Sequence, residues 1–147
     1  MASEADHIEL ANTNQNLIDH LIGENSFHDW LTTVAFYKAV HVVEAVFDNH
    51  LHKHSHSHAD REDRLKRTTR FELVFKNYLH LLNESRTFRY LLGPPGRLTI
   101  ETVKSRLIYK RLYAVEQNAL QFLSDSGKAA LHKIQPPPNP QIPAVSE

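Results

Sequence analysis

Five histidines alternate with other residues in the segment HLHKHSHSH, where the most conspicuous chemistry of the chain is concentrated. They are His50, His52, His54, His56 and His58. Neutral imidazole is the commonest metal ligand in proteins, and it suits zinc and nickel. In an extended segment alternate side chains project to the same side, so several of these rings would converge on one ion. The alternative is a polar loop that binds metal only adventitiously. We favour that alternative and expect no metal site and no cofactor.

His41 lies midway along an apolar segment, with Tyr37 one turn before it and Glu44 about one turn after it. One interpretation makes it a buried acid–base or RNA-contacting group. The other makes it a core histidine that a neighbouring hydroxyl or carboxylate satisfies. Spacing alone favours the core histidine.

Cationic side chains gather at two further places. Arg86, Arg89 and Tyr90 end a predicted helix, where cations complement the helix dipole and where arginine can also grip a phosphate through two parallel hydrogen bonds. A second group interleaves with Tyr109 and Tyr113, whose rings could stack on bases. It consists of Lys104, Arg106, Lys110 and Arg111. For that second group, a solvated basic face is the commoner outcome.

Composition excludes several classes of protein. The 147 residues carry 17 basic and 17 acidic side chains, so no global field steers the chain towards a polyanion. The chain lacks cysteine, which excludes disulfides, thiolate metal sites and cysteine nucleophiles. A serine elbow, a glycine-rich phosphate loop and an HExxH motif are also missing. The N-terminus has no signal-peptide pattern, so we expect a soluble, cytoplasmic protein without membrane contact.

Glycine and proline occur at few places, and the stretches between them predict helices only. These helices are expected over about 4–22, 26–47, 59–67, 71–90 and 100–124. From Trp30 to Phe47 almost no polar face is left, which is typical of a central, buried helix. The fold class is therefore all-α, an up-and-down bundle of four to five helices over residues 1–134. Residues 135–147 are rich in proline and predict a flexible tail.

The helix ends carry local signals of their own. Gly23 is placed to end the first helix. Ser26 and Asp29 have the spacing of a capping box for the second. Thr99 is a credible N-cap for the last long helix.

Three segments together resemble the HEPN family, the small α-helical domains of many prokaryotic toxin and defence systems. They are WLTTVAFYKAVHVVEAVF at 30–47, SHADR at 57–61 and FKNYLHLLNESRTFRY at 75–90. The long helix with an FY-x-A-x-H pattern, the Ser-His pair opening the next helix, and the arginine-bearing, tyrosine-ended turn carry the likeness. It covers about residues 5–125 and points to an uncharacterised branch of the family.

The resemblance implies a bundle that is commonly dimeric, and many members are metal-independent endoribonucleases that use Arg followed four to six residues later by His. This sequence contains no such pair. The residues that match positions facing the family's groove are His41, His58, Arg61, Arg86 and Tyr90. We therefore expect a nucleic-acid-binding, nucleotide-binding or regulatory module of a defence or toxin-type system, in which the ribonuclease motif is degraded.

Two alternatives stay open. One is an endoribonuclease with a non-standard site, in which His41 or His58 transfers protons and Arg61 or Arg86 stabilises the phosphate. The other is a bundle that binds metal through its histidine loop. The expected partners are RNA or a nucleotide, a second copy in a homodimer, and a protein partner such as an antitoxin. The residues expected to contact RNA are Arg89, Tyr90, Lys104, Arg106, Lys110 and Arg111.

Overall fold

The computed structural model describes residues 2–90 and 99–137, except for the side chains of Phe88 and Tyr90. Within these ranges every regular element is helical, which confirms the all-α bundle. The α-helices are α1 (Glu4–Glu24), α2 (His28–Val46), α3 (His58–Arg67), α4 (Glu72–Tyr90), α5 (Ile100–Thr102), α6 (Tyr113–Ala119) and α7 (Asp125–Ala130). Wider π-helical turns extend them at Phe47–Leu51 and Val103–Leu112, and 3₁₀ turns lie at Thr69–Phe71 and Leu120–Phe122.

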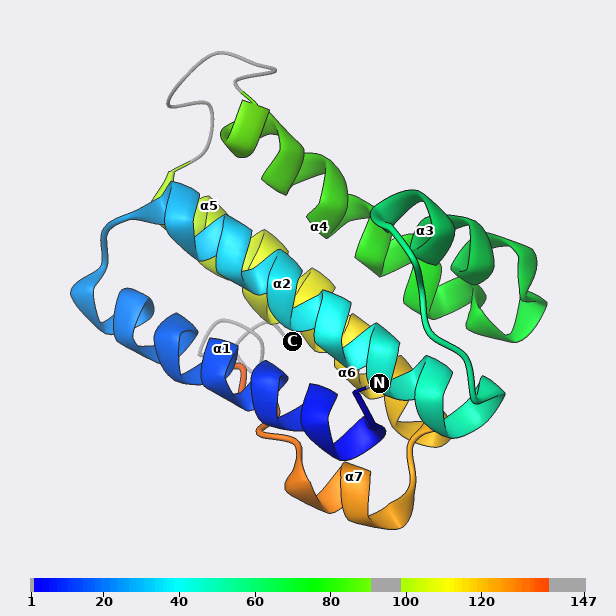
Figure 1. Ribbon diagram of the computed structural model, residues 1–147. Coiled ribbons are helices and arrows are strands. Elements are labelled where there is room, and N and C mark those ends of the chain that lie inside the picture. The colour runs from blue at the N-terminus through cyan, green and yellow to red at the C-terminus, as the bar shows by residue number, and fades with distance from the viewer. Residues whose placement is uncertain (1, 91–98, 138–147) are drawn as a thin grey trace, which may run out of the picture.

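The centre of the bundle is α2 (Figure 1). It contacts α1, α4, α6 and the π-helical segment Val103–Leu112. This position follows from its sequence, because a helix that is apolar nearly all round must bury every side. By length and composition His28–Leu51 could cross a membrane, but 78% of its most apolar stretch is buried inside the bundle, as in the core helix of a soluble protein.

Two helix ends differ from the prediction. The first helix ends at Glu24, with Asn25 rather than Gly23 in the left-handed conformation at φ 55°. The second begins at His28 after Phe27, which is also left-handed at φ 60°, and no side chain caps it. The capping box predicted from Ser26 is therefore wrong: two left-handed residues reverse the chain between α1 and α2 within three positions.

Two other helices begin at residues whose side chains cap them. Ser57 Oγ accepts a hydrogen bond from the Asp60 backbone N–H (3.0 Å), so α3 begins at His58, one residue before the predicted start. Thr99 Oγ1 accepts one from the Thr102 N–H (3.1 Å), as predicted. The proline pair at 94 and 95, which predicts the stop after α4, lies outside the described residues, as does most of the predicted tail (138–147).

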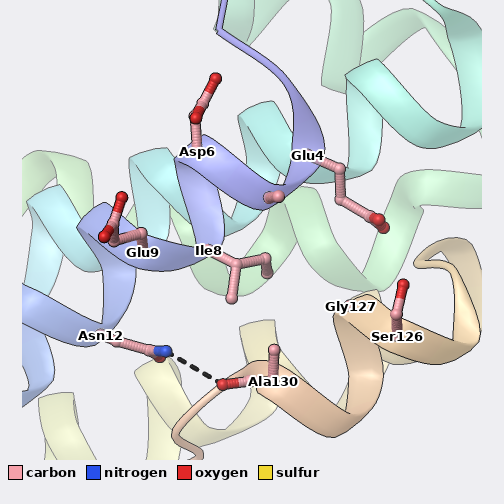
Figure 2. Close-up of a pocket in the computed structure, with 9 residues that line it drawn as sticks. Glu4, Asp6, Ile8, Glu9, Asn12, Ser126, Gly127 and Ala130 are labelled. Atoms are coloured by element: carbon pink, nitrogen blue, oxygen red, sulfur yellow. Dashed lines mark hydrogen bonds between the residues drawn. The ribbon is translucent and has the colours of Figure 1, made fainter.

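The short helix α7 folds back against the start of α1 (Figure 1). The Glu4 carboxylate accepts hydrogen bonds from the Ser124 N–H (2.8 Å) and hydroxyl. Asn12 Nδ2 donates to the Ala130 carbonyl (2.9 Å), as Figure 2 shows, and the Asn12 side-chain oxygen accepts from the His132 N–H (2.7 Å). Figure 2 also shows Glu4 pointing towards Ser126 and Gly127 across a small surface pocket. These polar contacts fasten the C-terminal segment to the N-terminal helix.

A fully buried ion pair joins Lys38 of α2 to Glu116 of α6. Lys38 Nζ also donates to Gln15 Oε1 (2.6 Å) and to the His132 carbonyl (2.7 Å). Glu116 Oε1 accepts from the Ile134 N–H (2.7 Å). Burial lowers the pKa of Lys38 and raises that of Glu116, because each charged form loses its hydration, while the partner's charge opposes both shifts.

Candidate functional site

The start of α3 carries a buried ion pair that positions an exposed histidine. Arg61 Nε donates to Glu44 Oε2 of α2 (2.7 Å), and Arg61 Nη1 lies 2.9 Å from His58 Nδ1. Arginine can only donate, so His58 Nδ1 accepts and the neutral ring carries its proton on Nε2. Glu44 Oε1 in turn accepts the Ser55 N–H (3.2 Å). One turn of α3 and the loop before it are therefore locked to the central helix.

The pKa of Glu44 reflects these contacts. Burial raises it, but the hydrogen bonds from Ser55 and Arg61 and the guanidinium charge outweigh burial, so the pKa lies below its ordinary value. Glu44 is consequently ionised at neutral pH. The Glu44–Arg61 pair is then a true ion pair that holds His58 in place.

The end of α4 brings two more guanidinium groups to the same region. Arg89 donates from Nη1 to the Tyr37 hydroxyl (3.2 Å) and from Nη2 to Ser85 Oγ (3.2 Å). Arg86 Nη2 lies 3.9 Å from Glu62 Oε1 of α3, a loose and partly exposed pair. The two arginines are thus held between α2, α3 and α4.

His58 and Arg89 meet over one pair of aromatic rings. The Arg89 guanidinium carbon lies 5.2 Å from the Phe36 ring centroid and 5.6 Å from that of Tyr37. The His58 ring lies 5.8 Å and 6.5 Å from the same two rings. Cation–π attraction favours the arginine in this position.

The pKa of His58 shows how much positive charge surrounds it. Burial lowers this pKa, and the charges of Arg61, Arg89 and Arg86 lower it further, so His58 is neutral at pH 7. The structure therefore brings together four of the predicted site residues: His58, Arg61, Arg86 and Arg89. It also offers a neutral imidazole among cations, which is an arrangement suited to an anionic ligand.

An open groove of about 460 Å³ adjoins this cluster. Its lining residues are Asp29, Trp30, Thr33, Tyr37 and Arg89. Trp30, which the sequence pattern placed in the buried helix, is 62% exposed. The lining residues Trp30, Tyr37 and Arg89, together with His58 and Arg86 of the adjoining cluster, are called the basic groove below.

Sequence reasoning missed Trp30 because the apolar run of α2 continues through it without a break. The available signal was its position in the first turn. The first turn of α2 directly follows the reversal of the chain at Asn25 and Phe27, so fewer neighbouring helices shield its side chains from solvent than in the middle of the helix.

His41 does not join the basic groove. Its Nδ1 lies 3.2 Å from His7 Nδ1 of α1, so the two rings share a hydrogen bond. Burial lowers the pKa of His41, and the neighbouring His7 and Arg61 lower it further. His41 is half-buried rather than part of the core, and its hydrogen-bond partner is His7 instead of the hydroxyl or carboxylate that its spacing suggested.

The histidines of the loop diverge rather than projecting to one side. His50 Nε2 lies 2.7 Å from Arg70 Nη1, and its ring packs on Phe71 and Phe122. His54 turns to Asp48, while His52 and His56 are exposed. The chain forms a π-helical turn and a left-handed residue here instead of an extended strand, which removes the alternation.

The basic residues of the last long helix are placed less favourably for stacking on bases. Lys104 Nζ lies 3.8 Å from Glu101 and 3.4 Å from Asn25 Oδ1, and Arg111 donates to Asn77 Oδ1 (3.1 Å). Arg106 and Lys110 are exposed. Tyr109 and Tyr113, however, are partly buried and pack against the core, so their faces are not open platforms. The side chain of Tyr90 lies outside the described part of the chain.

Comparisons with protein-family models, with curated proteins and with solved structures gave no match. The HEPN resemblance therefore rests on the three sequence segments alone.

Proposed function

We propose that this chain is a HEPN-like module that binds single-stranded RNA or a nucleotide in the basic groove. The observation that carries the proposal is that Arg89 lines one groove with the exposed ring of Trp30, while its guanidinium lies over the Phe36 and Tyr37 rings that the His58 ring also approaches. Guanidinium groups recognise phosphate, and an exposed indole is a stacking surface for a base. A defence or toxin-type role, a homodimer and an antitoxin partner follow only from the resemblance, and they remain predictions.

The groove supplies one chemical group for each part of a nucleotide. The Trp30 ring would stack on the base, and Arg89, held by Tyr37, would contact the phosphate. Asp29 lines the same groove, and its carboxylate would accept hydrogen bonds from a ribose hydroxyl or an exocyclic amine.

Fluorescence anisotropy with a short, labelled single-stranded RNA tests this proposal. Loss of base stacking in Trp30→Ala should weaken binding by about 1–3 kcal/mol, or roughly fivefold to 150-fold. Arg89→Ala should weaken binding and lower the slope of log affinity against log salt by about one. Arg67→Ala is the matched control, because Arg67 is 70% exposed and paired with Asp63 outside the groove. Equal losses in Arg89→Ala and Arg67→Ala would mean that binding is only a general charge effect.

A second candidate function is RNA cleavage without a metal, and the geometry of His58 favours it. The His58 ring, held by Arg61 through Nδ1, would donate its Nε2 proton in a hydrogen bond to the phosphate, and Arg86 would stabilise the charge that develops there. A water molecule would take the proton of the ribose 2′-hydroxyl. Atoms balance if the 2′-oxygen attacks the adjacent phosphorus and the 5′-oxygen leaves with a proton, which gives a 2′,3′-cyclic phosphate.

Incubation of transfer RNA and mixed RNA in the presence of EDTA tests this second candidate. Cleavage by the wild-type protein should disappear in His58→Ala and in Arg61→Ala, whereas His41→Ala should retain it. Equal residual cleavage in all four proteins would mean a contaminating nuclease.

A further inference from the structure

We propose that His7, Glu44 and His54 form a binding site for one zinc ion, which is separate from the basic groove but linked to it through the Glu44–Arg61 pair. One ligand atom of each residue lies within 4.8 Å of a ligand atom of the other two. The three residues come from the first turn of α1, from α2 and from the loop before α3. This site differs from the one that the histidine repeat suggested, because it takes a single histidine from the loop.

The spacing is close to what a tetrahedral site requires. When three atoms are all within 4.8 Å of one another, a point exists no farther than about 2.8 Å from each of them. Zinc lies about 2.0–2.2 Å from imidazole nitrogen and carboxylate oxygen. Shifts of less than about 1 Å in the three side chains would therefore bring all of them to bonding distance. A water molecule would complete the coordination.

Neighbouring groups already orient each ligand. His7 Nδ1 shares a hydrogen bond with His41 Nδ1 (3.2 Å), which fixes its ring. His54 Nε2 lies 3.4 Å from Asp48 Oδ1, and Asp48 is itself anchored by the Glu4 N–H (2.8 Å). Metal sites in proteins depend on such outer contacts for ligand orientation.

Glu44 and the loop are fixed in the same way. Glu44 Oε2 accepts from Arg61, and its Oε1 accepts the Ser55 N–H, yet each carboxylate oxygen offers two acceptor positions, so one remains for an ion. A second backbone bond, from the Lys53 N–H to the Phe47 carbonyl (3.3 Å), ties the loop to the end of the central helix. The loop that presents His54 is consequently held at both sides of that residue.

The chemistry of the ligand set indicates the ion. Two imidazoles and one carboxylate suit zinc, whereas calcium and magnesium prefer oxygen ligands alone. Both histidines are half-buried and Glu44 is 5% exposed, so an ion would be partly shielded from water. Bound zinc would join α1, α2 and the loop before α3, which would raise stability.

Isothermal titration calorimetry of the full chain, freed of metal with EDTA, tests the site with zinc chloride. We expect one zinc ion per chain, and an increase in melting temperature of at least about 5 °C when zinc is at a hundredfold excess over its dissociation constant. His54→Ala should abolish both effects, and since His54 lies in a loop, its loss should leave the helices intact by circular dichroism. His7→Asn should do the same.

Two exposed histidines of the same loop provide matched controls. His52→Ala and His56→Ala should bind zinc as the wild type does. Cobalt(II) gives a second readout, since a tetrahedral site produces a visible absorption band that His54→Ala should lose. Zinc binding that survives in His54→Ala but falls in His52→Ala or His56→Ala would mean adventitious binding by the loop, and no binding at all would also overturn the proposal. RNA binding is measured with EDTA present, so its failure and the failure of this site are distinguishable.

Discussion

Two side chains of the central helix α2 form ion pairs with different helices. One pair lies inside the core of the bundle, and the other lies next to the candidate site. Lys38 pairs with Glu116, and both side chains are completely sealed from solvent. Glu44 pairs with Arg61 under slight exposure, and it leads outwards through His58 to the basic groove. Both pairs are surrounded by hydrogen bonds, so burial alone does not mark function.

The two pairs differ in the groups to which they form further hydrogen bonds. The Lys38 pair ends on backbone groups, the His132 carbonyl and the Ile134 N–H, and thus fastens the C-terminal segment. The pair of Glu44 and Arg61 ends on a neutral imidazole among cations. A ligand can reach the second arrangement but not the first.

The largest expected effect comes from breaking the sealed pair. Lys38→Met should lower the free energy of unfolding by about 3–5 kcal/mol, because Glu116 would remain buried without its partner. Urea denaturation measures this. The double variant Lys38→Met with Glu116→Leu should recover most of the loss, since both charges are then gone. A loss below about 1 kcal/mol in the single variant would contradict the sealed arrangement.

A smaller loss of unfolding free energy is expected when the partly exposed pair of Glu44 and Arg61 is broken. Arg61→Ala should cost about 2–3 kcal/mol, since Glu44 loses its partner but water can reach part of the site. The double variant Glu44→Leu with Arg61→Met should recover stability, as at the sealed pair. It should nevertheless weaken RNA binding, because His58 loses the group that holds it. Full RNA affinity in that double variant would remove the distinction between the two pairs.

The affinity of the basic groove for RNA should depend on pH, and the lowered pKa of His58 sets the direction of that dependence. Burial and the three arginines hold this pKa below the ordinary value of 6.5, so the ring is neutral at pH 7 and gains a proton only at lower pH. A bound phosphate would favour that proton, so RNA affinity should rise by a factor of about three between pH 7.5 and pH 5.5. His58→Gln should flatten this dependence. An affinity that falls with acidification would mean that the neutral ring itself contacts the ligand.

The smallest change in RNA affinity is expected from substitution of His41. Because it pairs with His7 and lies outside the basic groove, His41→Gln should change RNA affinity by less than about twofold. Anisotropy titrations beside Trp30→Ala provide the comparison. A loss as large as that of Trp30→Ala would place His41 in the site after all.

The sequence predicted the fold well because long apolar runs and local caps decide it. The uninterrupted apolar face of α2 implied its central position, and Thr99 caps the last long helix as predicted. The prediction for the connection from α1 to α2 was wrong, because two non-glycine residues adopt left-handed conformations there. Such a choice depends on how the two helices pack rather than on residue type.

The candidate site was predictable only in part. The sequence named Arg61 and Arg86 because they stand near recognisable helix ends, and the structure places both close enough to affect the pKa of His58. Contacts between distant segments were not found, such as His7 with His41 and Lys38 with Glu116. These depend on helix rotation in the bundle, which a single sequence does not specify.

The chain contains one tryptophan, and it lies in the basic groove, so intrinsic fluorescence tests the central claim directly. Titration of the wild-type protein with a short single-stranded RNA should quench Trp30 emission to saturation, because a base stacks on the exposed indole. Arg89→Ala should shift that quenching to higher RNA concentration by about tenfold. RNA binding seen by anisotropy without any change in Trp30 emission would contradict the account, since the ligand would then occupy another surface.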